Sequence, residues 1–465
     1  MKKISFLTAL LSCLVLTSCF QTSSGPLSDG SYGKWSKSDG VSVQDGSTLT
    51  LDGEGAKAVL KNGKYKHFTL SMQVRTIDAG KGEVWFHTDK NLSKGYRVAI
   101  NNNLEDPVWW KMTGSLVSVR NLTKNFVKDG DWFDMKIVVS GQAIAVTIDD
   151  ELVVEYIQPA APHRTGENLN ALLSEGTFAL ASTGDGKVEF KNIEVAAYDP
   201  QMMTMHVPAQ LAAAVDEQAD PIIKLHQADF PVLDYHVHLK GGLTKEAAAE
   251  QSRRTGINYA IAPNCGIGFS LQSDADVRGY LDTMRSQPFI LAMQAEGREW
   301  VKTFSPEVRD MFDFVFTDAL TFTDDKGHRT RLWIPEETWI GGDQQKYMDM
   351  IVNRISGVLK EPADVYVNPC LLPYPMDQKF DEFWTEERMD IFVRDLVASG
   401  KALEINELYQ IPNKAILMKA KEAGVKFTFG TNNVIPEVSG LEYSLRMKEE
   451  CGLTPEDMYK PKRKN

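Results

Sequence analysis

Short segments of alternating apolar and polar residues follow one another from residue 32 to residue 198, separated by Gly, Asn and Asp. The clearest of them are 67–74, 95–100, 134–139 and 143–148. A period of two puts one set of side chains against a core and the other in water, as in antiparallel strands. Regularly spaced turn signals are typical of two packed sheets. The pattern predicts an all-β sandwich over 31–199.

After residue 230 the pattern changes to apolar, strand-like runs that alternate with helical stretches. The expected strands are 232–239, 258–263, 289–294, 312–317, 364–368, 402–406 and 426–430. The expected helices include 245–256, 344–359, 386–399 and 413–424. Such strand–helix units predict a parallel α/β barrel, a distorted TIM-like barrel of seven strands, over 231–455. Prolines around an alanine-rich stretch at 209–218 predict a linker over 200–230 with one helical segment.

The first twenty residues have the pattern of an export signal. Two lysines precede an apolar run over 4–16, which is too short to span a bilayer permanently. The run ends in Leu-Thr-Ser-Cys at 16–19, which resembles the lipobox of bacterial lipoproteins. The resemblance implies a signal peptide over 1–18 and a lipid on Cys19. An ordinary secretory signal is the alternative.

The segment that follows Cys19 extends this interpretation. Residues 19–30 are rich in Ser and Gly, which predicts a flexible tether. Phe20 stands where lipoproteins retained at the inner membrane commonly have aspartate. We therefore expect a lipid-anchored protein of the cell envelope, at the outer membrane, with the leaflet left open. No later segment is apolar enough to predict a membrane span.

Charge and cysteine content limit the classes of partner. The net charge of −12 argues against nucleic acid. Of the five cysteines, Cys13 and Cys19 belong to the N-terminal segment, which leaves Cys265, Cys370 and Cys451. Three cysteines make no disulfide framework, although one bridge is compatible with an oxidising compartment. Both domains are therefore expected to depend on their hydrophobic cores.

Polar side chains fall at the ends of the expected barrel strands. His236 and His238 are two residues apart on the first strand, so both imidazoles point to one side and can bind one metal ion. Glu296 and Asp318 end the third and fourth strands, as oxygen ligands or general bases. Polar residues at the ends of the remaining strands complete the ring around the barrel mouth, and we expect structural or substrate contacts from them: Asn264, Cys265, Asn368, Cys370, Glu404, Asn406, Thr431 and Asn432. Glu404 is also a candidate catalytic group.

The second half resembles the polymerase-and-histidinol-phosphatase (PHP) family of metal-dependent barrels. The matching stretches are 233–238, Glu296, 403–406 and 420–430. The resemblance implies a metal-dependent hydrolase. However, Asn264 and Asn368 stand where the family usually has histidines, and 431–433 lacks the histidine of the family's last motif. Two kinds of site are still compatible with the sequence. One is a single divalent ion (Zn, Mn or Fe) bound by His236, His238, Glu296 and Asp318, and the other is a sugar site without metal.

The first half resembles the 3-keto-disaccharide hydrolase family, whose domain is a concanavalin-like jelly roll. The matching stretches are 65–70, 95–100, 113–116, 131–134, 176–180 and 188–193. The resemblance implies a saccharide as substrate or ligand. Sugar sites combine aromatic rings with polar groups, and the candidates are Trp85, His87, Arg97, Trp109 and Trp110. If the last two lie on a strand, they face opposite sides and one of them is exposed.

Three functions compete. The first is an enzyme, a hydrolase or lyase whose barrel cleaves glycosides, including 3-keto-glycosides, while the sandwich binds the sugar. The second is a phosphoesterase of the barrel's own family, which the missing histidines disfavour. The third is a carbohydrate-binding lipoprotein without catalytic activity.

Overall fold

The computed structural model describes residues 23–28, 30–197, 215–324 and 326–462. The signal segment with Cys19 lies outside these residues, as does 209–214 of the expected linker helix. The described residues 215–220 are not helical, and helix α3 (Pro221–Gln227) begins only after them. No helix of the described ranges combines the length and apolar character that a bilayer span requires.

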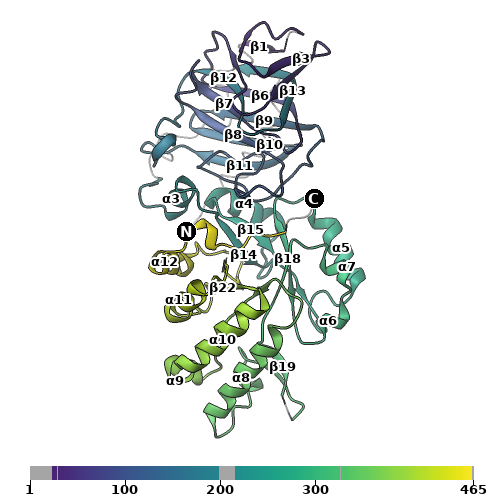
Figure 1. Ribbon diagram of the computed structural model, residues 1–465, viewed down its shortest axis with the longest axis vertical. Helices are drawn as coiled ribbons and strands as arrows, with labels where there is room; N and C mark the ends of the chain where they lie inside the picture. The colour runs from purple at the N-terminus through teal and green to yellow at the C-terminus, as the bar shows by residue number, and fades with distance from the viewer. Residues whose placement is uncertain (1–22, 29, 198–214, 325, 463–465) are drawn as a thin grey trace. The chain divides into compact units, whose positions relative to one another are not determined.

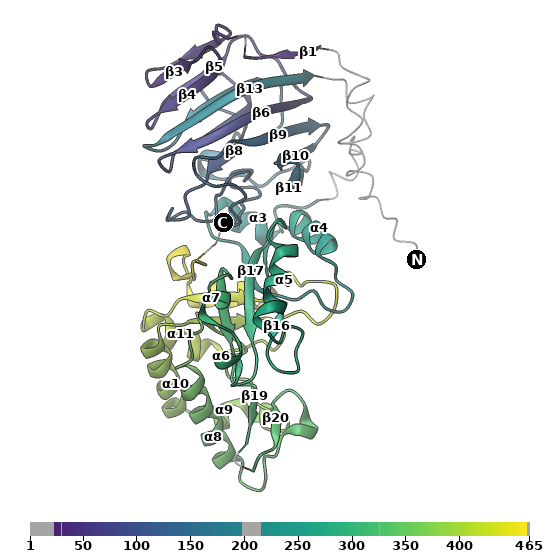
Figure 2. The same cartoon turned by 90° about the vertical axis from the view of Figure 1, so that its right-hand side faces the viewer.

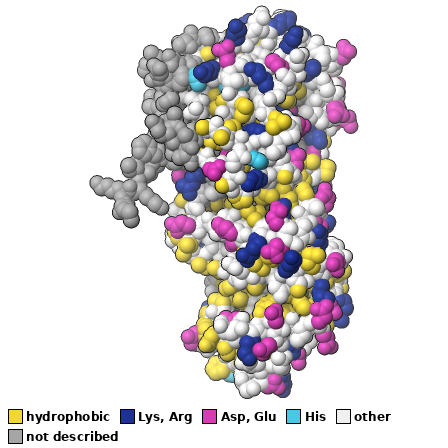
Figure 3. Space-filling model, turned by 90° about the vertical axis from the view of Figure 1, so that its left-hand side faces the viewer, with side chains coloured by type: hydrophobic (Ala, Val, Ile, Leu, Met, Phe, Trp, Pro, Cys, Tyr) yellow, Lys and Arg dark blue, Asp and Glu magenta, His cyan; other side chains and the backbone are white. Residues whose placement is uncertain are grey.

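The chain divides into two compact units. Of the described residues, one unit comprises those from 23 to 232 with Arg253–Gly256, and the other comprises Leu233–Ser252 with those from 257 to 462. In the second unit, Cys265, Cys370 and Cys451 are buried free thiols. Lys, Arg, Asp and Glu side chains are interspersed over the face drawn in Figure 3.

The first unit is an antiparallel sandwich of two sheets, as the alternation predicts (Figures 1 and 2). The larger sheet has the order β11-β10-β9-β6-β13-β4-β3, with β1 also paired to β13. Its strands are β1 (Ser23–Pro26), β3 (Val41–Gln44), β4 (Thr48–Asp52), β6 (Phe68–Ile77), β9 (Phe133–Ser140), β10 (Ala143–Ile148), β11 (Glu151–Ile157) and β13 (Lys187–Ala197).

The smaller sheet has the order β2-β5-β12-β7-β8. Its strands are β2 (Trp35–Lys37), β5 (Lys57–Leu60), β7 (Lys81–Thr88), β8 (Tyr96–Asn101) and β12 (Thr177–Ser182). Core and outer residues alternate along the strands. On β6, for example, Phe68, Leu70 and Met72 are buried, and the residues between them are half-buried. The aligned inner faces form one apolar core.

The two adjacent tryptophans correct the expectation from the sequence. Trp109 and Trp110 lie in a turn, not on a strand, so they need not face opposite sides. They are 3% and 8% exposed, and their rings meet edge to face with centroids 5.7 Å apart. The expectation that one of them is exposed is wrong.

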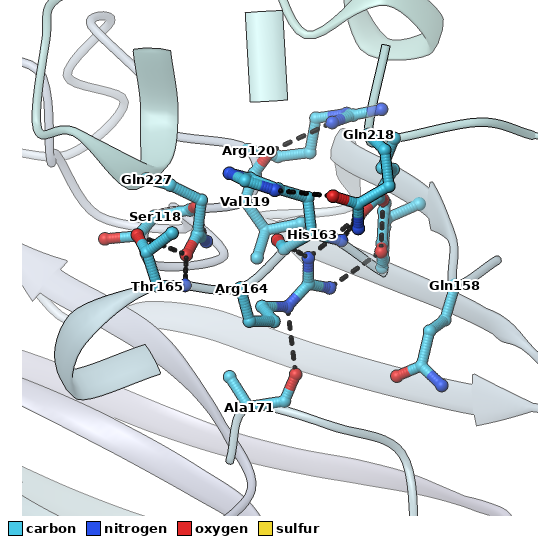
Figure 4. A network of polar contacts seen from close by, with 12 residues as sticks. Ser118, Val119, Arg120, Gln158, His163, Arg164, Thr165, Ala171, Gln218 and Gln227 are labelled. Carbon is cyan, nitrogen blue, oxygen red and sulfur yellow. Dashed lines mark hydrogen bonds and ion pairs between the residues drawn. The ribbon is translucent and has the colours of Figure 1, made fainter. Parts of the chain in front are cut away.

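A buried charge is fully partnered inside this unit. Nη1 of Arg164 lies 2.9 Å from Oε2 of Glu217, and both side chains are 3% exposed. Nη2 donates to the hydroxyls of Tyr96 and Tyr156. Nε donates to the carbonyl of Ala171 (Figure 4). A buried ion is tolerated when its donors are satisfied. Arg164 thus joins β8, β11 and the irregular segment after β11.

The second unit is a closed parallel barrel. The strand order is β15-β14-β23-β22-β21-β18-β17-β16, and β15 also pairs with β17, which closes the ring. The second of the seven strand positions is broken into β15 and β16. The strands are β14 (Leu233–Val237), β15 (Asn258–Ile261), β16 (Asn264–Cys265), β17 (Ile290–Ala295), β18 (Phe314–Thr317), β21 (Val365–Tyr366), β22 (Ala402–Asn406) and β23 (Phe427–Gly430).

Helices surround this barrel, as Figure 1 shows. The longer ones are α4 (Lys245–Thr255), α5 (Asp274–Met284), α8 (Gln344–Val358), α10 (Glu386–Ser399), α11 (Lys414–Glu422) and α12 (Glu442–Cys451). Short ones are α6 (Trp300–Thr303), α7 (Pro306–Arg309) and α9 (Phe380–Phe383), and β19 (Thr321–Thr323) forms a hairpin with β20 (Arg329–Arg331). The predicted strand 364–368 is shorter in the structure, where β21 covers only Val365–Tyr366, and the positive φ of 48° at Asn368 is incompatible with an extended strand there.

We predict that Arg164→Met lowers the stability of the sandwich by about 3–5 kcal/mol, because it leaves the Glu217 carboxylate buried without its cation. Chemical denaturation of the full chain, followed by tryptophan fluorescence, measures the change. Lys136→Met is the matched control, since Lys136 pairs with an exposed Asp150 at 3.7 Å and its loss should hardly move the transition. Equal shifts in both variants would contradict the prediction.

Candidate active site

The barrel mouth contains a cavity of about 540 Å³. Parallel strands bring their carboxyl ends to one edge, so side chains distant in sequence line it together. Its charged and amide side chains are Lys240, Asn264, Gln294, Glu296, Asp318, Asn368 and Asn432. His238, Tyr280, Trp333, Tyr409 and Phe269 add ring surfaces. A pocket with convergent polar groups and aromatic walls is the usual form of a small-ligand site.

His236 on β14 and His238, directly after it, differ in position. His238 lines the cavity, and its Nδ1 lies 2.7 Å from the carbonyl of Ala262. Burial lowers the pKa of His238 well below its ordinary value, so the ring is neutral. His236 lies behind the cavity wall, and its Nδ1 lies 2.6 Å from Oε1 of Glu404. The two rings are 4.9 Å apart between centroids.

Glu296 and Asp318 form a buried carboxyl pair on one side of the cavity. Oε1 of Glu296 accepts from Asn264 at 2.8 Å, whereas its buried Oε2 makes no hydrogen bond within the described residues. Asp318 accepts two hydrogen bonds of 2.9 Å, from the backbone of Leu320 and from Nδ2 of Asn368.

The surroundings of the two carboxyl groups affect their pKa values differently. Burial raises the pKa of Glu296 to about 8, and the negative charge of Asp318 adds to this effect. Burial also raises the pKa of Asp318, but its two hydrogen bonds oppose the rise. Two neighbouring buried carboxyls hold one charge more easily than two. We therefore place the negative charge on Asp318 and the proton on Glu296.

A network behind the cavity holds these groups in place. Oε2 of Glu404 accepts from the backbone of Asn368 at 2.7 Å and from Nδ2 of Asn406 at 3.0 Å. Oδ1 of Asn368 accepts from Asn406 and from Asn432, at 3.0 and 2.9 Å. Glu404 and Asn406 are fully buried and do not line the cavity. They position other groups and cannot touch a ligand directly.

The absence of a side chain at Gly430 is required for this network. A Cβ at that position would collide with Oε1 of Glu404 and with Cβ of His236. The last strand, β23, can therefore pass close enough to β14 and β22 only with glycine there.

The expected metal ion needs at least three ligands from this set. Nε2 of His236 is buried without a hydrogen bond in the described part of the chain, and that of His238 makes none of standard geometry. Yet no three His, Cys, Asp or Glu side chains among the described residues are arranged to hold a metal ion. As placed, the residues offer two nitrogen ligands and do not fit a complete centre. The metal ion expected from the sequence is therefore not assigned to these residues, and no step below uses it.

A second cavity of about 730 Å³ lies beside the first, because Trp333 and Tyr409 line both. Its other apolar side chains include Leu332, Leu372, Tyr374 and Phe380. Trp333 is 38% exposed and Tyr374 is 62% exposed, which is unusual for such large apolar groups. The barrel mouth therefore combines a polar pocket with an aromatic neighbour.

The candidates in the sandwich do not form one site. Trp85 and Arg97 are cross-strand neighbours on β7 and β8, with the guanidinium 5.4 Å from the ring centroid. Arg97 also donates to Asn168 and Glu167. His87 is 1% exposed, and both of its ring nitrogens contact backbone groups. It lies in the interior, as Trp109 does, and offers no surface to a ligand.

Several cavity residues were missed from the sequence. Gln294 and Lys240 could have been found, because each is two residues from a predicted site residue, Glu296 and His238 respectively, and the strand period puts Gln294 on the same face as Glu296. Trp333 and Tyr409 lie in connecting segments that have no periodicity, so no sequence signal marks them.

The fold of the first unit defines the jelly-roll class of antiparallel β-sandwich. Residues 24–196 match the family model of the 3-keto-alpha-glucoside-1,2-lyase-like domain, so this part of the chain is a domain of that family. The chain matches no curated protein.

Solved structures resemble parts of the chain only distantly. One is a protein of Parabacteroides distasonis ATCC 8503 to which glycosyl hydrolase activity is provisionally ascribed. It is 18% identical, the match covers 38% of this chain and 99% of that chain, and the TM-score is 0.33. Another is the carbohydrate-binding module CBM66 of Bacillus subtilis, with 16% identity, 35% and 96% covered, and a TM-score of 0.28.

Proposed function

We propose that this protein is an enzyme that cleaves glycosides, as a lyase or hydrolase, in the barrel cavity. The observation that carries the proposal is the buried pair Glu296 and Asp318, in unlike environments, within a pocket otherwise lined by amide and aromatic side chains. The family of the sandwich domain supports a sugar substrate. A lipid on Cys19 would hold the protein at the cell envelope, where it meets extracellular glycosides.

The favoured substrate is a 3-keto-glycoside. A carbonyl at C3 acidifies the proton on C2, so Asp318 can remove that proton as general base. The C2–H electron pair forms an enolate and then a C1=C2 double bond. The C1–O bond breaks toward the aglycone oxygen, which takes a proton from Glu296. Addition of water to the double bond would make the net reaction a hydrolysis.

Other residues then have supporting roles. Lys240, which is the one cationic side chain in the described lining, can stabilise the enolate oxygen. Asn264, Asn368 and Asn432 are suited to contacts with sugar hydroxyls. A single lysine is a poor match for a phosphate dianion, so the site favours a glycoside over a phosphate ester.

The second cavity suits the aglycone. A sugar in the polar pocket would direct its leaving group toward Trp333 and Tyr409, which connect the two cavities. We therefore expect aromatic or otherwise apolar aglycones.

We predict that Glu296→Gln lowers kcat by about 10²- to 10⁴-fold on 3-keto methyl glucoside, because the methoxide leaving group needs a proton. The loss should be much smaller on the 4-nitrophenyl substrate, since nitrophenolate leaves without protonation. Asp318→Asn should slow both substrates. Aglycone release, measured by steady-state kinetics, distinguishes the two roles.

The pH dependence provides a control on this assignment. The proton of Glu296 is present below its pKa of about 8, so the wild-type rate on the methyl substrate should fall as the pH rises through that value. The 4-nitrophenyl substrate should lack this fall. Equal losses on both substrates in Glu296→Gln would show that Glu296 is not the acid.

We predict that activity survives dialysis against a chelator, because the described donors do not complete a metal centre. Metal analysis of the purified protein should find substoichiometric Zn, Mn and Fe. Activity that disappears on chelation and returns with one of these ions would instead establish a metal site on His236 and His238.

We predict that Trp333→Ala raises KM for aryl 3-keto-glycosides by about tenfold and leaves KM for the methyl substrate nearly unchanged, because it removes aromatic surface beside the aglycone. Trp339→Ala is the matched control. Trp339 is 54% exposed, stacks on His328, and lines neither cavity. A KM change of the same size in the control would contradict the role of the second cavity.

A further inference from the structure

A third cavity, of about 680 Å³, lies on the sandwich unit, at one end of the smaller sheet. Its walls come from β2, from β5 and the turn after it, and from the neighbouring ends of β7 and β12. Lysine is its most frequent residue, with Lys37, Lys57, Lys61, Lys64, Lys90 and Lys94. We call this feature the lysine groove.

The positive charge of the lysine groove is not neutralised within it. Six lysines face two carboxylates, Asp89 and Glu175, an excess of four positive charges in a chain whose net charge is −12. Asp89 is occupied by hydrogen bonds to Ser93 and to the backbone of Asn91. None of the six lysines forms an ion pair within the described residues.

The contacts that these ammonium groups do make leave their charge available. Nζ of Lys61 donates to the carbonyl of Gly33 at 3.1 Å, and Nζ of Lys94 donates to the carbonyl of Glu175 at 3.0 Å. Carbonyls orient an ammonium group without neutralising it. Lys57, Lys64 and Lys90 are exposed. Like charges that line one groove repel one another, and an anion bound among them would relieve that repulsion.

The remaining lining resembles a surface for sugar hydroxyls. Hydroxyl and amide side chains come from Ser36, Ser38, Asn62, Thr88 and Thr177. The described lining contains no aromatic side chain, so it lacks the platform on which nucleic-acid bases stack.

We propose that the lysine groove binds an acidic polysaccharide, whose carboxylate or sulfate groups pair with the lysines while its hydroxyls contact the Ser, Thr and Asn side chains. This site is separate from the barrel cavity, and its existence does not depend on the proposed glycoside cleavage.

Binding of the full chain to polysaccharides tests the proposal. The probes are polygalacturonate, which carries carboxylates, dextran sulfate, which carries sulfates, and neutral dextran, each titrated by calorimetry at low and high salt. We expect binding of at least one acidic probe that weakens with salt, and no binding of dextran. A preference between the acidic probes identifies the anionic group.

A triple variant locates the site. Lys57→Gln with Lys61→Gln and Lys64→Gln should weaken binding at least tenfold. The control triple, Lys128→Gln with Lys136→Gln and Lys187→Gln, makes the same change of net charge on the sandwich outside the groove and should bind normally. Unchanged thermal transitions would show that both variants fold.

Three results would overturn the proposal. One is that neither acidic probe binds. Another is that both triple variants lose the same affinity, which would make the effect one of net charge alone. The third is that single-stranded DNA binds as tightly as the polysaccharides and depends on the same lysines.

Discussion

One buried carboxylate bridges the seam between the first and last barrel strands. β14 and β23 share a single ladder pair, Asp234 with Phe429. The side chain of Asp234 compensates by accepting from the backbone of His236 and from both the backbone and the hydroxyl of Thr431, at 3.0, 3.1 and 2.5 Å. Together with the bond from the backbone N–H of Asn432 to the carbonyl of His236, at 2.8 Å, these bonds hold this side of the cavity in place.

The sequence predicted the regular elements well, because their periodicity reflects burial. β10, β22 and α10 have the predicted bounds, and the other expected strands lie within a few residues of theirs. Helix α10 ends at Gly400, whose φ of 67° only glycine adopts readily. The break between β15 and β16, and the burial of both Trp109 and Trp110, depend on tertiary contacts that no local pattern records.

The site was predictable where it lies directly after the carboxyl ends of strands. His238, Glu296 and Asp318 were placed at the cavity from the sequence, because parallel strands must end together. His236 and Glu404 were also noted, but their pairing behind the wall was not, since a strand pattern cannot tell which of two close side chains reaches the opening. Trp333 lies in a connecting segment, where the sequence has no periodicity that would predict its position.

The two sites have opposite preferences for charge. The barrel cavity holds the Glu296 and Asp318 pair, so an anionic group placed there would meet a negative charge in a poorly solvated environment. The lysine groove has the reverse balance. This difference in charge suits the proposed binding of uncharged glycosides in the barrel and of acidic polymers on the sandwich. An enzyme that held an acidic polysaccharide in this way would bind it without cleaving it, and would act on uncharged glycosides found with that polymer.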